Sequence, residues 1–111
     1  LTGDIHSNWV NELKVDYDRE EAKTVAAEFV GTSITSGGDG TFEPKNLEGL
    51  MHDNPCLKFH SRERGYVTCT VTPKIWRSDY QAVEYVTKPG APLLTRASYV
   101  VENGRRAVEK A

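Results

Sequence analysis

The strongest constraint on the fold is a two-residue alternation in the second half of the chain. Between Gly65 and Thr72, Val67, Cys69 and Val71 fall on one face and hydroxyl-bearing side chains fall on the other. This period is typical of a β-strand, because successive side chains of a strand point to opposite faces. A second alternating run, Asp79 to Thr87, follows after a predicted turn. The two runs predict an antiparallel hairpin.

The rest of the chain adds further strands and one short helix. Apolar and β-branched residues favour a largely buried strand over Thr24–Ile34, and Asn54-Pro55 ends a predicted helix. The fold class is therefore α+β, mostly antiparallel β. The predicted elements and turn are strands Lys14–Tyr17, Thr24–Ile34 and Leu93–Glu102, helix Pro44–His52 and the hairpin turn Pro73–Ser78.

Length and charge exclude several classes of protein. A chain of 111 residues is at most one domain, and its net charge of −2 is spread without a basic face, which argues against nucleic-acid binding. No apolar run approaches the length of a transmembrane span. The chain opens on what looks like the end of a strand, so we expect it to be part of a longer polypeptide. Its two cysteines, Cys56 and Cys69, permit a disulfide without requiring one.

Asp4 and His6 are the sharpest candidate site. If Leu1 to His6 ends a strand, an aspartate and a histidine two residues apart lie on the same side and place a carboxylate oxygen and an imidazole in one cleft. The spacing alone favours a surface aspartate beside a structural histidine. Two ligands are also too few for a catalytic metal, which takes three or more from the protein.

Other candidate groups have simpler structural interpretations. His52, Cys56 and His60 are four residues apart, but Pro55 interrupts the helix that would align them as zinc ligands or as a Cys–His catalytic pair. Glu28 in its apolar strand fits an exposed edge or a pair with arginine. The Ser36–Gly40 segment lacks the ending of a P-loop, so a plain flexible loop is favoured over a phosphate cradle.

Aromatic and basic residues leave similar alternatives open. Trp9 and Trp76 fit cross-strand packing as well as a ligand-stacking face. The arginines fit ordinary strand-edge charges as well as phosphate clamps. These arginines are Arg62, Arg64, Arg77 and Arg96.

Several motifs taken together resemble the alkaline phosphatase D family, which also includes a Streptomyces-type phospholipase D. The resemblance covers nearly the whole chain, and its specificity comes from several motifs in one order. The matching segments are Leu1–Trp9, Ala27–Ile34 with Ser36-Gly37-Gly38, Asn54-Pro55, Arg64–Val67, Trp76-Arg77, Asp79-Tyr80 and Ala97–Val101.

The resemblance implies a fold and an activity. It implies that residues 1–111 are the C-terminal portion of a calcineurin-like metallophosphoesterase catalytic domain, a β-sandwich with flanking helices. Such an enzyme is a secreted phosphomonoesterase and phosphodiesterase that uses metal-activated water, of either alkaline phosphatase or phospholipase type. The partner implied is the upstream polypeptide of the same enzyme, without which we expect the isolated chain to be inactive. The alternative is a free-standing β-rich binding module without catalysis.

The resemblance also implies site residues. It identifies Asp4 and His6 as metal ligands, with iron and calcium as cofactors, and it places Asn8 and Trp9 at the substrate-binding site. The substrate implied is a phosphate ester or a phospholipid. The sequence departs from the family at Cys56, where a histidine commonly follows the Asn-Pro pair, and at His60. Both departures put a role for that loop in doubt.

Overall fold

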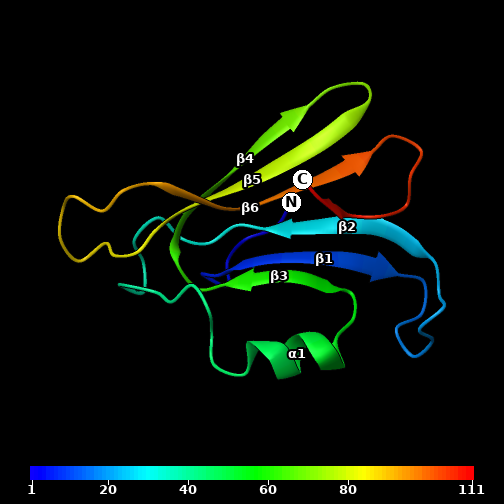
Figure 1. Ribbon diagram of the computed structural model, residues 1–111, viewed down its shortest axis with the longest axis horizontal. Helices are drawn as coiled ribbons and strands as arrows, with labels where there is room; N and C mark the ends of the chain where they lie inside the picture. The colour runs from blue at the N-terminus through cyan, green and yellow to red at the C-terminus, as the bar shows by residue number, and fades with distance from the viewer.

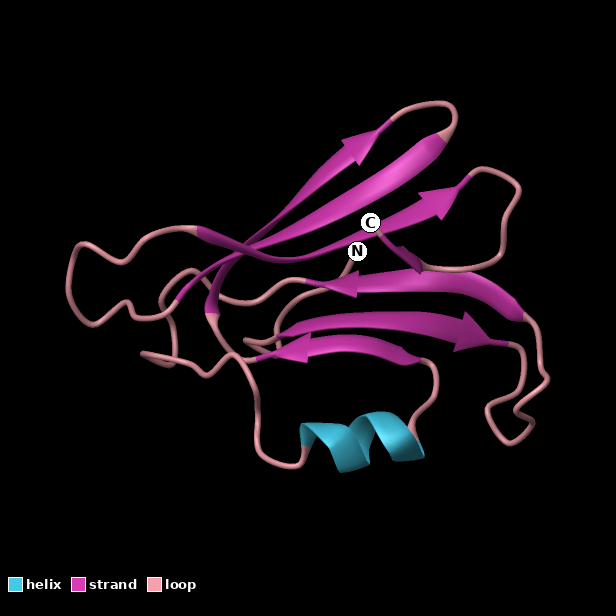
Figure 2. Ribbon diagram, in the orientation of Figure 1, coloured by secondary structure: helices cyan, strands magenta, loops and turns pink.

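The computed structural model describes residues 1–111 as seven strands and one short helix. The strands lie in two antiparallel sheets, one of three strands in the order β2-β1-β3 and one of four in the order β4-β5-β6-β7 (Figures 1 and 2). The elements are β1 (Asn8–Lys14), β2 (Thr24–Val30), α1 (Leu47–Asp53), β3 (Leu57–Ser61), β4 (Arg64–Val71), β5 (Ile75–Val83), β6 (Leu94–Glu102) and β7 (Glu109–Lys110).

This architecture confirms a mostly antiparallel β fold with a single short helix. The helix has 7 residues, none of them buried, and it is not long and apolar enough to span a membrane. It ends at Asn54, whose backbone N–H donates to the carbonyl of Leu50, as the Asn54-Pro55 pair predicts. The calcineurin-like arrangement with several flanking helices stays a prediction.

The predicted hairpin is present as β4 and β5, but its turn is tighter than predicted. The Thr72 and Ile75 backbones are hydrogen-bonded, so Pro73 and Lys74 alone form the loop. Pro73 begins the turn because its fixed φ suits that position and its missing N–H costs no strand pairing. Trp76 therefore lies in β5, paired with Val71 across the hairpin, and is not part of a turn.

Strands β1 and β3 show where alternation failed as a guide. The predicted strand Lys14–Tyr17 is wrong, since the strand is β1 and ends at Lys14, and β3 was not predicted. The inner-facing positions of β1 include Asn8 and Glu12, which are buried yet polar. Their burial is permitted by hydrogen bonds, including the one from the Val108 N–H to the Glu12 carboxylate (2.9 Å).

Strand β2 is shorter and more exposed than predicted. It ends at Val30, and Val25 is 55% exposed, because β2 is an edge strand of the three-stranded sheet. Glu28 lies on this edge strand, where its carboxylate accepts hydrogen bonds from Thr2 (3.1 Å) and Asn11 (2.9 Å) and pairs with no arginine.

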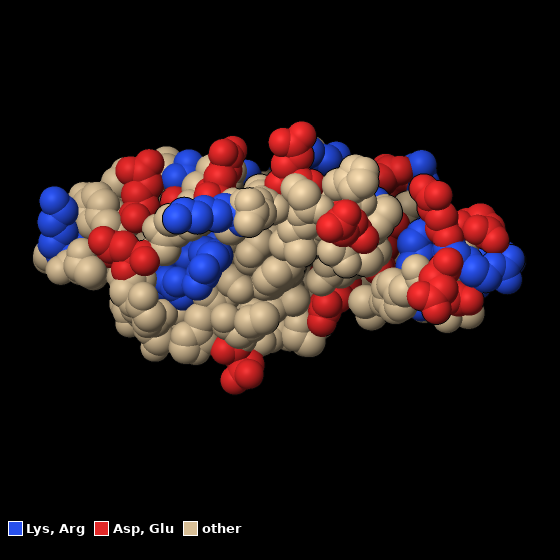
Figure 3. All heavy atoms as spheres, turned by 90° about the horizontal axis from the view of Figure 1, so that it is seen from below, with Lys and Arg blue, Asp and Glu red and all other residues tan.

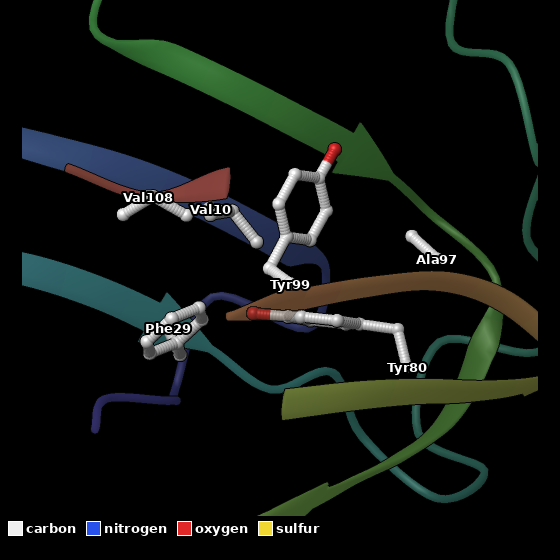
Figure 4. Packing of buried hydrophobic residues seen from close by; sticks show 6 residues of the cluster. All are labelled: Val10, Phe29, Tyr80, Ala97, Tyr99 and Val108. Atoms are coloured by element: carbon white, nitrogen blue, oxygen red, sulfur yellow. The ribbon is translucent and has the colours of Figure 1, made fainter. Parts of the chain in front are cut away.

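The core forms where the inner faces of the two sheets meet (Figure 4). Tyr80 from β5 is 1% exposed, and its hydroxyl donates to the carbonyl of Trp9 in β1 (2.7 Å). Tyr99 from β6 donates to the carbonyl of Lys58 in β3 (2.9 Å). These tyrosines bury apolar rings and still satisfy their hydroxyls by bridging the sheets. The core residues are Val10, Phe29, Tyr80, Ala97, Tyr99 and Val108.

Candidate functional site

The segment that carries Asp4 and His6 is a turn. A single parallel bridge pairs Thr2 with Val30, after which the backbone enters the left-handed region at Asp4 (φ 73°) and at His6 (φ 58°). The expectation that strand alternation aligns the two side chains is therefore wrong. A left-handed turn sets their directions, and both residues are exposed.

Left-handed backbone at two residues that are not glycine is costly. Each such residue costs on the order of 1 kcal/mol or more and persists where surrounding contacts hold it. Aspartate and histidine are among the residues that tolerate this region best. The chain has three non-glycine residues with positive φ, and two of them are the candidate metal ligands Asp4 and His6.

The chemistry of Asp4 and His6 fits a metal in part. Both side chains are free of hydrogen bonds and ion pairs within the chain, so a carboxylate oxygen and an imidazole nitrogen are available as donors. This mixed pair suits iron, whereas calcium prefers oxygen ligands alone and matches only Asp4. No group of three histidine, cysteine, aspartate or glutamate side chains gathers to hold a metal. Asp4 and His6 therefore do not form a three-residue cluster of these types with another side chain of the chain.

A buried arginine holds the turn in place. Arg64, at the start of β4, is only 5% exposed, and its guanidinium donates to the His6 carbonyl (2.8 Å) and the Ser33 hydroxyl (2.9 Å). A third bond goes to the carbonyl of Arg62 (3.0 Å). The planar guanidinium offers five donors in fixed directions, so it can bind two distant segments and its own preceding residues at once. Arg64 thus ties the turn to the loop after β2.

The backbone around Arg64 is held by an ion pair between buried Glu63 and half-buried Arg96. Glu63 is 2% exposed, and both its carboxylate oxygens accept hydrogen bonds from Arg96 (2.8 and 2.7 Å). These bonds raise the pKa of Arg96 above its ordinary value. A two-bond arginine–carboxylate pair fixes orientation as well as charge. We call the group formed by Asn8, Glu63, Arg64 and Arg96 the Arg64 cluster.

Asn8 lies within this cluster and beneath the turn. It is 3% exposed, its amide NH₂ donates to the Glu63 carbonyl (3.3 Å), and its amide oxygen accepts from the Thr32 N–H (3.2 Å). Both ends of the amide are thus occupied by the protein. The role of Asn8 in substrate binding stays a prediction, while its visible contacts join β1 to the segments on either side.

Trp9 stacks on His60 across β1 and β3. The two ring centroids are 3.5 Å apart, and the planes are inclined by 20°. The indole N–H donates to the Ser7 hydroxyl (2.7 Å), one residue after His6. His60 is buried, and its Nδ1–H donates to the Asn8 carbonyl (3.0 Å). The pKa of His60 is lowered, mainly by burial and also by the nearby positive charge of Arg62. The hydrogen bond to Asn8 has the opposite, smaller effect and raises the pKa.

The glycine-rich loop lies against the fold at three points. Gly37, with φ 92°, sits over the Arg64 guanidinium, where an added Cβ would lie 3.7 Å from it. At Gly40 a Cβ would collide with the backbone of Arg62. Asp39 accepts hydrogen bonds from the backbone N–H groups of Val86 (2.7 Å) and Thr87 (3.1 Å), which lower the pKa of its carboxyl. These contacts pack the loop against Arg64, Arg62 and the segment after β5. The prediction of a plain flexible loop did not include this packing.

The remaining sequence candidates are dispersed. His52 is exposed beside Asp53, whereas His60 is buried on another element, so no His52–Cys56–His60 site forms, as the interruption by Pro55 predicts. Cys56 and Cys69 are both free. Trp9 and Trp76 pack across strands, as their simpler interpretation predicts.

Arg64 is the residue that sequence reasoning placed least well. Interpreting the arginines as strand-edge charges is wrong for Arg64, which is buried and binds the distant His6 and Ser33 segments. The available signal was Gly65, which follows Arg64 and lets the backbone approach β5, since a Cβ there would meet the Gln81 carbonyl at 1.9 Å. A close approach at this point brings the preceding arginine inside the fold.

The chain matches known phosphatases over its whole length. Residues 1–80 match the family described as PhoD-like phosphatase. The chain is 44% identical over 110 residues to alkaline phosphatase D of Bacillus subtilis (strain 168), a match that covers 99% of this chain and 19% of that protein. A solved structure titled "Structure of PhoD" superposes with a TM-score of 0.90 at 44% identity, covering 97% of this chain and 21% of that one.

This chain therefore spans about a fifth of the length of the relatives that it matches. The Asp4–His6 turn, the glycine-rich loop and the Arg64–Gly65 pair all lie inside the matched residues. On the family match together with 44% identity along nearly its full length, the chain belongs to the PhoD-like phosphatase family.

Proposed function

We propose that this chain is the C-terminal part of a metal-dependent phosphoesterase, and that Asp4 and His6 are two of its metal ligands. The observation that carries the proposal is the left-handed turn that presents an unpaired carboxylate and an unpaired imidazole two residues apart. Strained backbone of this kind is retained where it serves a site. Membership of a phosphatase family supplies the reaction class.

Iron and calcium are the cofactors we propose. When bound, such ions act as Lewis acids that neutralise charge on the phosphoryl oxygens and lower the pKa of water. Asp4 and His6 would hold one of them jointly, and Asp4 alone has the ligand type that calcium prefers. The remaining ligands would come from the upstream part of the enzyme.

The chain's own contribution is to position these ligands. Arg64 fixes the His6 carbonyl, and the Glu63–Arg96 pair fixes the strand that carries Arg64. Preorganised ligands avoid the cost of reorganisation during the reaction. We also propose that Trp9, whose indole N–H donates to the Ser7 hydroxyl beside the turn, contacts the organic part of a substrate.

The proposed substrates are phosphate monoesters and diesters. A phospholipid substrate, as in the phospholipase branch of the family, is included in the proposal, and so is secretion of the enzyme. These assignments rest on the family resemblance. Hydrolysis of a soluble aryl phosphate, an aryl phosphodiester and a phosphatidylcholine vesicle by the full-length protein separates the three activities.

Substitution of the two ligands tests the proposal. In the full-length protein, His6→Ala and Asp4→Asn should each abolish turnover and lower the iron or calcium content measured by mass spectrometry. His52→Ala is the matched control, because His52 is exposed and remote from the turn, and it should retain both. Wild-type turnover in the His6→Ala variant would overturn the assignment.

A further inference from the structure

A cationic cavity adjoins the turn of the proposed metal ligands. It has a volume of about 660 Å³ and is bordered on one side by Ile5 and Ser7, the two neighbours of His6 in the sequence. Pockets that hold small molecules run from about 300 to 1,000 Å³. Asp4 and His6 themselves do not line it. The cavity therefore lies beside the proposed reaction centre and not on it.

Part of the wall of this cavity is apolar. Trp9 and His60 form a stacked pair, and Leu50 of α1 and Pro44 add aliphatic surface. The indole is pinned by its bond to Ser7, and the imidazole by its bond to the Asn8 carbonyl. Rigid aromatic walls of this kind favour a flat organic group.

The charges at the cavity are all of one sign. Lys45 and Arg62 line it, both side chains are exposed, and neither belongs to an ion pair of the chain. No aspartate or glutamate lines the cavity. In Figure 3, which views the molecule from below, Lys and Arg side chains adjoin a broad uncharged surface, with Asp and Glu side chains around them. The backbone N–H of Arg62 donates to the Thr41 carbonyl (2.9 Å), which fixes the strand end that carries one of the two cations.

We propose that this cavity binds the organic group of the phosphate-ester substrate and selects groups that carry a negative charge. The apolar wall would hold the body of the group, and Lys45 and Arg62 would bind its anionic substituent. A quaternary ammonium group is disfavoured, because two unpaired cations repel it. The inference rests on the proposed function, since it assumes that phosphorus is bound at the adjacent turn.

The test measures binding of three non-hydrolysable phosphonates whose para substituents are neutral, anionic and cationic. Benzylphosphonate is compared with its 4-carboxy and 4-trimethylammonio derivatives by calorimetry on the metal-loaded full-length protein. The carboxylate should bind about fivefold more tightly than the parent compound and the ammonium about fivefold more weakly, as expected for partly exposed charge contacts.

Substitutions at the cavity test whether Lys45 and Arg62 cause the preference for the carboxylate. Arg62→Gln and Lys45→Gln should each reduce the preference for the carboxylate, and the double variant should abolish it. Arg62→Glu should invert the preference toward the ammonium. Lys74→Gln is the matched control, since this lysine lies on the β4–β5 turn outside the cavity. All these side chains are exposed, so an unchanged melting temperature should accompany each variant.

The outcomes separate this inference from the proposed function. A charge preference that responds to Arg62 and Lys45 supports the cavity even if aryl phosphates are not hydrolysed, in which case only the catalytic proposal fails. Equal binding of the three phosphonates by the wild-type protein overturns the cavity, even if turnover is normal. A preference that survives in the double variant overturns it as well.

Discussion

The apolar core and the Arg64 cluster are both buried, but they are built on different physical principles. The core joins the sheets through Val10, Phe29 and two tyrosines, and its stabilisation scales with the area removed from water. The Arg64 cluster depends on directional hydrogen bonds and one ion pair, each with a single acceptable geometry. The comparison teaches that the core sets how stable the fold is, whereas the cluster sets where the turn lies.

The largest expected effect is in the core. Phe29→Ala should lower the free energy of unfolding by about 4 kcal/mol, because a buried phenylalanine side chain leaves a cavity between the sheets. Denaturant unfolding followed by tryptophan fluorescence measures the loss. Val25→Ala, at an exposed position of the same strand, should change it by less than about 0.5 kcal/mol. Similar losses from both variants would show that β2 is not packed as described.

The ion pair of the cluster comes next. Glu63→Ala should cost about 3 kcal/mol of unfolding free energy, because partly desolvated Arg96 loses both short hydrogen bonds and keeps only the longer contact with exposed Glu84 (3.5 Å). The control is Glu21→Ala, which breaks the exposed Arg19–Glu21 pair and should cost less than about 0.5 kcal/mol. If the two losses are equal in denaturant unfolding, burial does not strengthen the Glu63–Arg96 pair.

A substitution of Arg64 tests whether the cluster sets the position of the turn and, through it, the activity. Arg64→Lys keeps the charge but cannot reach the His6 carbonyl, Ser33 and Arg62 at once, so kcat of the full-length enzyme should fall about tenfold. Bound metal should fall with it, while KM should change little, since the residue acts through the turn. Arg77→Lys, on the four-stranded sheet, should leave kcat unchanged. A normal kcat and metal content in Arg64→Lys would separate Arg64 from the site.

The smallest expected effect is a pH dependence from His60. Burial lowers the pKa of His60 in the folded protein, so the unfolded chain binds the proton first as the pH falls. The contribution of neutral His60 is therefore complete above about pH 6.5 and is lost progressively below it. Unfolding of wild type and His60→Phe between pH 7.5 and 5 measures it as a difference in slope. Equal slopes would show that His60 is not buried in its neutral form.

Sequence patterns predicted those parts of the fold whose cause is local. The alternation around Val67 and Cys69 marks β4, and the residues that follow return as β5, because a half-buried strand imposes period two. Asn54-Pro55 ends α1 for a steric reason that involves only neighbouring residues. Strand β6 was located to within one residue, from Leu93 as predicted to Leu94 as observed.

Patterns of apolar residues failed to predict the strand whose buried side chains are polar. Asn8 and Glu12 occupy inner positions of β1, and no rule based on apolar periodicity recognises such a strand. The partners that make this burial tolerable are distant in sequence: Thr32 and Glu63 for Asn8, and Val108 for Glu12. Only the folded chain brings them together.

The sequence by itself determined the family and the candidate ligands Asp4 and His6, because several motifs in a fixed order can be recognised without knowing which residues are in contact. Tertiary structure alone decided that these ligands lie on a left-handed turn and that Arg64 holds that turn from 58 residues away. It also decided that Lys45 and Arg62 border one cavity beside Trp9. The physical reason is that hydrogen bonds and charge contacts act through space, whereas a sequence pattern reports only the local preference of its own residues.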